Sequence, residues 1–454
     1  MYMFYLRDYI VDPEKHFIRE SKMNFVDHIK FIFWNKGRNN DIEIAEYFKL
    51  FKEKKFETIS HQAIGKQRIY IKPKLFENLY KHFINLIYRD HPNFSKIKGY
   101  IVCACDSSIF DLPNVTLTRF EFNIEENTIF ETHRVRARVS GMLDVNSKFM
   151  LVTKIVEKTV KETTLAMDHL NELKKRFDIK KFIAVYDRGY KSIELMLFTE
   201  KLESKFLIRL PKNTFAKKRR QIKGNDKIIE INLTNAILKE FENKDLVKFA
   251  NEIGRYKLRI VEIKLDNGST EVLATNLSIE EFTFEELKEL YAKRWSIETG
   301  FKKLKSQIQI EEFSGHRRVI IEQDFYAKIL IYNLATAIQW DAEHQMKIKQ
   351  RKTWEEYIYK SNFATITGLI FNYMEYLLSG IGKYINDAVE FLIKQGRRLY
   401  HQKNIRKLRL NHLIKILNDI ILQLKWGDEW ESKKPIRSAS DPSNDHPGTP
   451  KRSH

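Results

Sequence analysis

Apolar residues along the chain follow helical spacing at first, then strand-like runs, and then helical spacing again. Residues 1–98 are mostly helical by this pattern, with an amphipathic stretch at 42–52. Strand-like runs then alternate with helices, with strands expected at 99–113, 134–145, 149–157, 182–190 and 205–211 and helices at 162–178 and 192–202. This order predicts an α/β fold whose mixed sheet has an antiparallel and a parallel part.

A basic segment interrupts the core pattern from residue 211 to residue 270. It contains the run from Lys217 to Arg220 and strand-like pieces such as 257–265, so we predict a β-rich insertion. Core character then returns, with a strand at 271–278 and helices at 284–309 and 320–339. A helical region follows to about residue 430, and the polar, proline-containing tail at 431–454 is expected to be disordered.

The charge balance indicates a polyanionic partner. The 454 residues include 80 Lys and Arg against 60 Asp and Glu, a formal net charge of +20. Nucleic acid is the first partner that such a surplus indicates, an anionic membrane surface is the second, and a basic protein without such a partner is the remaining alternative. The most apolar long stretch, 363–382, contains Asn372 and Glu375, so we expect a buried helix there and no membrane span.

The two cysteines, Cys103 and Cys105, exclude two classes of protein. Two thiols cannot complete a zinc site by themselves, and they cannot build a disulfide framework. Because they are two residues apart in a strand, they are expected on one face of it, toward the core. A reducing compartment, and so a cytoplasmic location, fits the sequence.

The N-terminal region contains a candidate helix-turn-helix. Ser60 is a suitable N-cap for a short helix over residues 61–68 that follows the amphipathic helix at 42–52. In a helix-turn-helix, Gln62, Lys66 and Arg68 would face DNA. An ordinary helical pair with a solvated polar face is the alternative.

Four polar residues share one face of the predicted helix over residues 291–305. At about 100° per residue, Tyr291, Arg294, Glu298 and Lys305 fall within roughly 60° of arc, beside an apolar stripe. Taken alone, this pattern is explained by an amphipathic helix with an Arg–Glu pair at i, i+4.

Two aspartates extend the pattern toward chemistry. Asp106 ends the apolar run IVCAC, and Asp187 ends the apolar run FIAVY. Together with Glu298 they make three carboxylates that two strands and one packed helix can bring together. Such hard oxygen ligands suit Mg²⁺ or Mn²⁺, and two ions about 4 Å apart support phosphoryl transfer.

These motifs carry a resemblance to a known family. The spacing Tyr291-x2-Arg294-x3-Glu298-x6-Lys305 resembles the Y-R-E-K signature of the insertion-sequence-4 family of bacterial DDE transposases. The segment from Asp187 to Tyr190 resembles the second-aspartate motif of that family, and Asp106 resembles its first aspartate. The resemblance implies an RNase H-like core, interrupted by a β-rich insertion and flanked by helical N-terminal and C-terminal regions.

The resemblance implies a division of the chain. The expected segments are a helical DNA-binding region at 1–98, the core at 99–210 and 271–345, the insertion at 211–270, a helical C-terminal region at 346–430 and the tail at 431–454.

The resemblance also implies roles for individual residues. Asp106 would bridge two Mg²⁺ ions, for which Mn²⁺ can substitute, while Asp187 and Glu298 would each hold one. Tyr291, Arg294 and Lys305 would contact DNA phosphates near the cleaved end. Trp295 would stack on a base or pack in the core, and Arg188 would contact a phosphate or orient Asp187.

The implied function is DNA transposition. Such an enzyme binds the terminal inverted repeats of an insertion sequence as a homodimer, cleaves the DNA ends and transfers the 3′-hydroxyl strands to target DNA. It would have no membrane partner and would be associated with the nucleoid when bound to DNA. A non-catalytic, domesticated or regulatory DNA-binding protein is the alternative, and an RNase H-like nuclease without strand transfer is a third hypothesis. Basic stretches in the insertion and at 394–409 fit phosphate contacts or solvated faces.

One departure from the family concerns excision through a DNA hairpin. Some relatives stack a flipped base on a Trp of the insertion. No Trp lies between residues 200 and 290 here, so Tyr256 or Phe249 would have to substitute.

Overall fold

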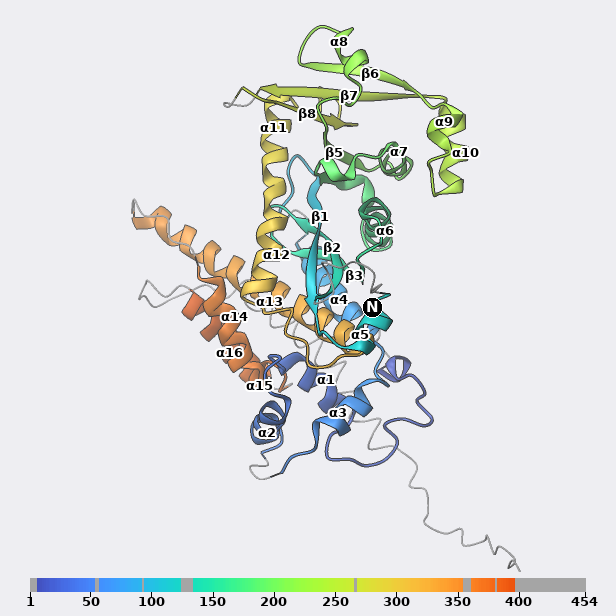
Figure 1. Cartoon of the computed structure of the whole chain (residues 1–454). Coiled ribbons are helices and arrows are strands. Elements are labelled where there is room, and N and C mark those ends of the chain that lie inside the picture. Colours follow the sequence, from blue (N-terminus) through green and yellow to red (C-terminus); the bar gives the residue numbers. More distant parts are fainter. Residues whose placement is uncertain are drawn as a thin grey trace, which may run out of the picture.

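A single mixed sheet runs through the molecule (Figure 1). The computed structural model describes residues 6–53, 57–91, 94–123, 134–264, 268–353, 361–379 and 382–396. In these parts of the chain the sheet has eight strands, in the order β3-β2-β1-β4-β5-β8-β7-β6. The strands are β1 (Ile101–Leu112), β2 (Val135–Asp144), β3 (Met150–Glu157), β4 (Phe182–Tyr186), β5 (Lys205–Leu210), β6 (Asp226–Asn232), β7 (Arg255–Lys264) and β8 (Thr270–Thr275).

The strand directions confirm the α/β prediction. β1 pairs with β4, and β4 with β5, in parallel, whereas the other neighbours are antiparallel. An antiparallel β3-β2-β1 unit followed by parallel β4 and β5 is the arrangement of an RNase H-like core.

The helices of the first half of the chain are η1 (Leu6–Tyr9), α1 (Phe25–Trp34), α2 (Asn40–Phe51), α3 (His61–Arg68), α4 (Lys74–Asp90), α5 (Thr116–Glu121), α6 (Glu162–Lys174), η2 (Ile179–Lys181), η3 (Arg188–Tyr190) and α7 (Ile193–Lys201). Those of the second half are α8 (Ala216–Arg220), α9 (Asn235–Leu238), α10 (Lys244–Ile253), α11 (Phe284–Ala292), η4 (Lys293–Trp295), α12 (Ser296–Ser306), α13 (Arg318–Thr353), α14 (Phe363–Asn372), α15 (Met374–Leu377) and α16 (Gly382–Gly396). No helix in the described ranges is both long and apolar enough to cross a membrane.

Helices cover the RNase H-like part of the sheet on two sides. In Figure 1, α6 and α7 lie on one side of the strands, and α12 and α13 lie on the other. α12 approaches the sheet at Gly300, where an added Cβ would come within 2.7 Å of Leu143 and 3.4 Å of the Tyr332 hydroxyl. This close contact fixes α12 against β2 and α13.

β1 is an inner strand of the sheet, and its first half is apolar on both faces. Residues 101–105 are all buried, and the free thiols of Cys103 and Cys105 lie in the core, as predicted. Strands covered on both faces have continuous apolar runs. The strand continues past this run to Leu112, so Asp106 lies in the middle of β1.

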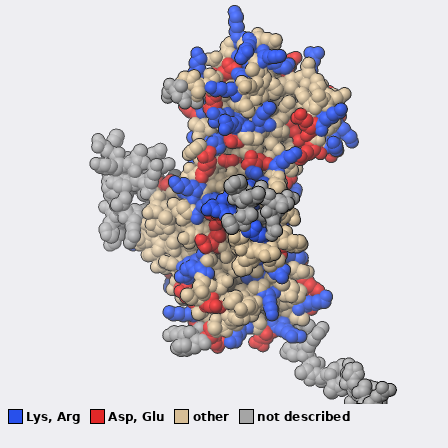
Figure 2. All heavy atoms as spheres, viewed as in Figure 1, with Lys and Arg blue, Asp and Glu red and all other residues tan. Residues whose placement is uncertain are grey.

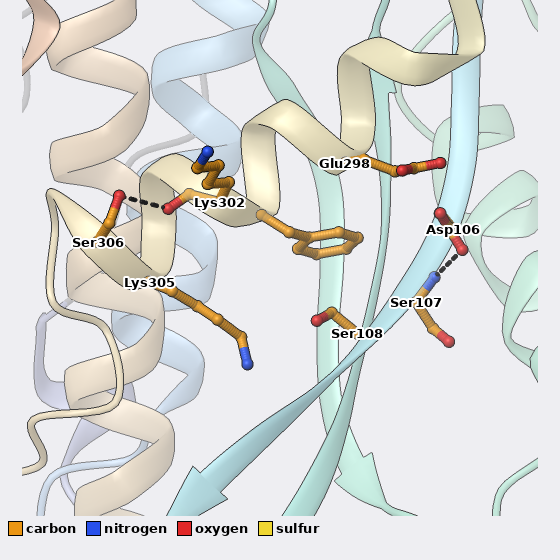
Figure 3. A pocket seen from close by; sticks show the side chains of 8 residues that line it. Asp106, Ser107, Ser108, Glu298, Lys302, Lys305 and Ser306 are labelled. Atoms are coloured by element: carbon orange, nitrogen blue, oxygen red, sulfur yellow. Dashed lines mark hydrogen bonds between the residues drawn. The ribbon is translucent and has the colours of Figure 1, made fainter.

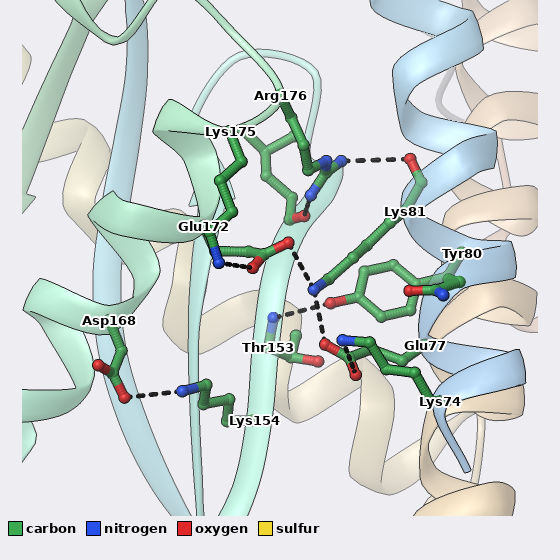
Figure 4. A network of polar contacts seen from close by, with 12 residues as sticks. Lys74, Glu77, Tyr80, Lys81, Thr153, Lys154, Asp168, Glu172, Lys175 and Arg176 are labelled. Carbon is green, nitrogen blue, oxygen red and sulfur yellow. Dashed lines mark hydrogen bonds and ion pairs between the residues drawn. The ribbon is translucent and has the colours of Figure 1, made fainter. Parts of the chain in front are cut away.

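A polar network ties α6 to α4 at the β3 edge of the sheet (Figure 4). Lys81 pairs with Glu77 at 2.6 Å and with Glu172 of α6 at 2.7 Å. Arg176 donates to the backbone oxygens of Lys81 and Leu151. The α6 helix is therefore anchored at its C-terminal end, far along the helix from its first residue.

The insertion continues the core sheet. β8 pairs with β5 on one side and with β7 on the other, and β7 pairs with β6 at the edge. The strands predicted within 211–270 are therefore extra strands of the same sheet, with α8, α9 and α10 beside them (Figure 1). Segment boundaries along the chain remain predictions.

The candidate helix-turn-helix needs one correction. Ser60 does cap α3, accepting a hydrogen bond from the Ala63 amide, and Gln62 and Lys66 are exposed. Arg68 is instead buried, with its side chain 2% exposed, because it pairs with Asp324 of α13 at 2.6 Å. Arg68 therefore joins the N-terminal region to the core and does not face solvent.

Two predicted regions lie mostly outside the described residues. Of the basic stretch at 394–409 the structure describes only the first three residues, and the tail at 431–454 is not described. The expected helix at 363–382 is present as two helices, α14 and α15, which meet at Tyr373.

The buried Arg68–Asp324 pair gives a stability prediction. Arg68→Ala leaves the Asp324 carboxylate buried without its cation, which should lower the free energy of unfolding by about 3–5 kcal/mol. The exposed Lys180–Glu203 pair provides the control, because Lys180→Ala should cost less than about 1 kcal/mol. Urea unfolding followed by circular dichroism measures both, and equal effects would contradict the role of Arg68.

Candidate active site

The two aspartates lie level with each other on neighbouring parallel strands. β1 pairs with β4 in the register Ala104↔Val185. Continuing this register by two residues brings Asp106 opposite Asp187, which directly follows β4. Neighbouring strands are about 4.8 Å apart, so the register alone makes these carboxylates close neighbours.

Backbone amides orient both aspartates. One oxygen of Asp106 accepts a hydrogen bond from the Ser107 amide at 2.8 Å. Asp187 caps the short helix η3 and accepts from the Gly189 amide at 2.8 Å. Each side chain is therefore fixed by the turn or strand that carries it.

The helix that carries Glu298 differs from the prediction. Residues 284–306 form α11, a 3-10 turn at η4 and then α12, instead of one regular helix. The tighter turn at η4 places Tyr291, Arg294 and Glu298 on three successive elements. The predicted arc on one helix face was therefore wrong in detail, although the residues still converge.

Arg294 lies between two of the three carboxylates. Its Nη2 donates to Oε1 of Glu298 at 2.7 Å, and its Nη1 is 3.5 Å from Oδ2 of Asp106. The guanidinium is only 11% exposed. A cation so placed offsets the cost of bringing buried carboxylates together.

The pKa of Asp106 reports this crowding. Burial raises the pKa of the Asp106 carboxyl to about 6, and the nearby Asp187 and Glu298 carboxylates add to the rise. The Ser107 amide and Arg294 act in the opposite direction. Asp187 and Glu298 thus both act electrostatically on the carboxyl of Asp106.

A pocket of about 490 Å³ opens beside Asp106 and Glu298 (Figure 3). Its lining consists of Asp106, Ser107, Ser108, Glu298, Phe301, Lys302, Lys305 and Ser306. The carboxylates of Asp106 and Glu298 point toward each other across one end, and the two lysines lie farther along α12 (Figure 3). The pocket therefore combines an acidic end with a basic flank.

The predicted DNA-contacting residues differ in exposure. Tyr291 is buried, and the Arg294 guanidinium lies 5.9 Å from the centre of its ring. Trp295 is 65% exposed, so the core-packing alternative for this residue is wrong. Arg188 is exposed, and it is the Gly189 amide, rather than Arg188, that hydrogen-bonds to Asp187.

Lys305 lines the pocket but already has partners in this structure. Its ammonium donates to the backbone oxygen of Ile109 at 2.5 Å and pairs with Glu311 at 3.0 Å. It also lies 4.6 Å from the centre of the Phe110 ring. A phosphate contact by Lys305 therefore remains a prediction that requires these bonds to exchange.

Sequence reasoning missed several residues around the carboxylates. Lys302 lies four residues after Glu298, and this helical spacing alone could have identified it. Glu162 and Arg138 approach Ser107 from α6 and β2. No local pattern indicates the last two, because only the tertiary fold brings them to β1.

The aromatic substitutes proposed for the insertion are enclosed. Tyr256 is buried, and Phe249 is half-buried and lies against Lys201. In this structure Tyr256 is therefore not positioned to stack on a base, as the substitution would require.

Two comparisons of the sequence with known proteins point to transposases. Residues 124–334 match the family described as "Transposase DDE domain". The match contains Asp187 and Glu298, whereas Asp106 lies before it. Over 138 residues the chain is 27% identical to the transposase for insertion sequence element IS231E of Bacillus thuringiensis subsp. finitimus. These matches support a DDE transposase.

The matches differ in the share of each chain that they cover. The alignment with the IS231E transposase covers 30% of this chain and 27% of that relative. Among solved structures, a piggyBac transposase synaptic complex with hairpin DNA aligns over 92% of this chain and 82% of that chain. The sequence identity to that chain is 12%, and the TM-score is 0.37.

The raised pKa of Asp106 predicts how stability depends on pH. Because the folded-state pKa of about 6 exceeds the ordinary value of 3.8, the folded protein binds the proton more tightly, and ionisation costs stability as pH rises through this window. Asp106→Asn should therefore stabilise the protein by about 3 kcal/mol at pH 7.5 and by almost nothing at pH 3.5. Urea unfolding at both pH values, with EDTA present, measures this difference. A gain of the same size at both values would contradict the assignment.

Proposed function

We propose that this chain is a DNA transposase that binds the terminal inverted repeats of a bacterial insertion sequence, cleaves the DNA ends and transfers the 3′-hydroxyl strands to target DNA. The observation that carries this proposal is that Asp187 and Glu298 both act on the carboxyl of Asp106, while Arg294 lies between Asp106 and Glu298 beside an open pocket. The sequence match to a transposase DDE domain supports the same reaction class.

The carboxylates fit divalent cations by their chemistry. Carboxylate oxygens are the ligands that Mg²⁺ and Mn²⁺ prefer, and Asp106, Asp187 and Glu298 supply them from three elements. Among the described residues no group of three or more His, Cys, Asp or Glu converges closely enough to hold an ion as it stands. Arg294 occupies the space between Asp106 and Glu298, so we expect its side chain to move when a cation binds to these oxygens.

The family resemblance supplies the role of each acid in this proposal. When bound, the ions supply Lewis-acid activation of water and neutralise charge on the scissile phosphate. Asp106 would bridge two ions, with Asp187 and Glu298 holding one each. Arg294, once it leaves the carboxylates, is positioned to bind a phosphate of the cleaved strand in a bidentate manner.

The surface around the insertion suits a DNA backbone. Figure 2 shows Lys and Arg side chains gathered over the upper part of the molecule, where the insertion lies. Lys217, Lys218 and Arg220 are exposed there, whereas Arg219 is buried and pairs with Glu262. Neutralising phosphates with these side chains would make binding fall steeply with salt. Exposed Gln62 and Lys66 of α3 are candidates for a second contact.

The partner would be double-stranded DNA at two ends, which requires two copies of the chain in one complex. A homodimer bound to DNA is therefore part of the proposal, and exposed Trp295 next to Arg294 is positioned to stack on a base near the cleaved end.

The proposal is tested by cleavage of DNA that carries the repeats flanking the coding region. Wild-type protein with Mg²⁺ should nick the repeat boundary and join the freed end to target DNA. Asp187→Asn and Glu298→Gln should abolish both reactions, because each removes a cation ligand, and should bind end DNA within about threefold of wild type.

Two results would redirect the proposal. Binding of end DNA without metal-dependent cleavage by any variant would favour the non-catalytic DNA-binding protein. Cleavage without joining would favour an RNase H-like nuclease.

Arg294 gives a second prediction with opposite signs for two ligands. Arg294→Ala removes the cation that neutralises Asp106 and Glu298, so the DNA-free protein should bind Mn²⁺ about tenfold more tightly. The same variant loses a charge-assisted phosphate contact and should bind end DNA about tenfold more weakly. Titration calorimetry and gel-shift assays measure the two affinities.

Lys302→Ala is the matched control for Arg294. It removes a cation from the same pocket, but this exposed lysine makes no ion pair with Asp106 or Glu298 within the described structure. Its effect on Mn²⁺ affinity should be much smaller. Equal gains in Mn²⁺ affinity for the two variants would show that Arg294 acts only through overall charge.

A further inference from the structure

A fourth carboxylate lies next to the two aspartates. Glu162 is the first residue of α6, and its side chain is 32% exposed. It follows a turn after β3 and takes no part in the resemblance described above. Its surroundings, however, belong to the elements that carry Asp106 and Asp187.

One oxygen of Glu162 is bound to β1 and β2. Oε1 accepts a hydrogen bond from the hydroxyl of Ser107, the residue after Asp106, and pairs with Nη1 of Arg138 at 2.5 Å. Arg138 Nη1 also donates to the Ser107 hydroxyl at 2.9 Å, and the same guanidinium is held by the backbone oxygen of Lys158. The three side chains therefore form a closed unit beside Asp106.

The other oxygen of Glu162 faces the loop of Asp187. A Cβ added to Gly189 would lie 3.5 Å from Oε2 of Glu162 and 3.1 Å from Oδ1 of Asp187. Both carboxylates thus border the space that a side chain at position 189 would occupy. Such a side chain would be in tight contact with Asp187 and in ordinary van der Waals contact with Glu162.

We propose that Glu162 is a positioning residue of the active site, which holds Ser107 and the Gly189 loop so that Asp106 and Asp187 keep the separation that a divalent cation requires. The role rests on the proposed function, because it acts through the two aspartates. Arg138 neutralises Glu162 and fixes its Oε1, while Oε2 limits how far the Asp187 loop can move.

The hydrogen bond from Ser107 explains how Glu162 can act on Asp106. Asp106 itself accepts from the Ser107 amide, so a shift of Ser107 moves the carboxylate directly. Outer groups that orient metal ligands commonly change metal affinity by more than tenfold when removed. The measurable quantity is therefore cation affinity, which a purely structural contact would leave unchanged in a folded protein.

The experiment measures Mn²⁺ affinity of the full-length, DNA-free protein by titration calorimetry. Glu162→Ala should weaken Mn²⁺ binding by about tenfold or more. Glu162→Gln should stay within about threefold of wild type, because its carbonyl oxygen has the same reach and still accepts from Ser107. Ser107→Ala removes the same hydrogen bond from the other side and should weaken binding in the same direction.

Glu172→Ala is the matched control. Glu172 lies on the same helix, is 24% exposed and pairs with Lys81 of α4 (Figure 4), so its removal tests whether any change in α6 disturbs the site. Mn²⁺ affinity of this variant should stay within about twofold of wild type, since distant sites act independently. Circular dichroism establishes that each variant is folded, and Ser107→Ala decides the question if Glu162→Ala does not fold.

Three results would overturn the role of Glu162: unchanged Mn²⁺ affinity in Glu162→Ala, an equal loss in Glu172→Ala, or a Gln variant as weak as the Ala variant. Asp187→Asn separates this failure from failure of the proposed function. If Asp187→Asn loses Mn²⁺ affinity while Glu162→Ala does not, only the positioning role fails. If neither variant loses affinity, the cation centre fails as well.

Discussion

The repulsion among carboxylates that share a partly buried space is the constraint on which the site depends. Burial and the neighbouring carboxylates of Asp187 and Glu298 all disfavour the charged form of Asp106. A cation must offset this cost, and in this structure the cation is the guanidinium of Arg294. The same constraint supports the proposal that divalent ions bind here, because one such ion carries more charge than one arginine.

Rigid packing makes this arrangement possible. Parallel pairing of β1 with β4 sets the level of Asp106 and Asp187, and no loop rearrangement is needed to bring them together. Gly300 lets α12 lie close enough to the sheet for Glu298 to face Asp106. The 3-10 turn η4, between α11 and α12, turns the Arg294 side chain toward both carboxylates. Sheet register and helix packing thus fix the separations to which electrostatics responds.

Apolar periodicity was sufficient to predict the strands of the core and the helices α6 and α7, because buried strands and amphipathic helices leave a local pattern. The three acids were selected by their positions beside such apolar runs, and their roles stay a prediction. Apolar periodicity could not predict features that arise from tertiary contacts. Arg68 is basic and lies on a short polar helix, as a DNA-contacting residue would. It is nevertheless buried against Asp324 of α13, which is distant in the sequence. Likewise, Glu162 contacts Ser107 only because the fold brings α6 beside β1. The 3-10 turn at η4 was not predicted either, because the apolar stripe of a helix continues through a single 3-10 turn.

The insertion joins the core through β8, near α11, the helix that precedes Arg294. The basic insertion and the residues around Arg294, the two parts of the proposed DNA surface, are therefore connected. Arg209 of β5 pairs with Glu271 of β8 at 3.0 Å, and both act electrostatically on the hydroxyl of Tyr291. Tyr291 in turn supports the guanidinium of Arg294 from below. Because β8 joins the insertion to β5 within one sheet, the basic insertion and the residues beside Arg294 share one support of paired strands. If DNA binds along the insertion as proposed above, that binding and the release of Arg294 from its carboxylates are expected to be coupled, because both involve this support.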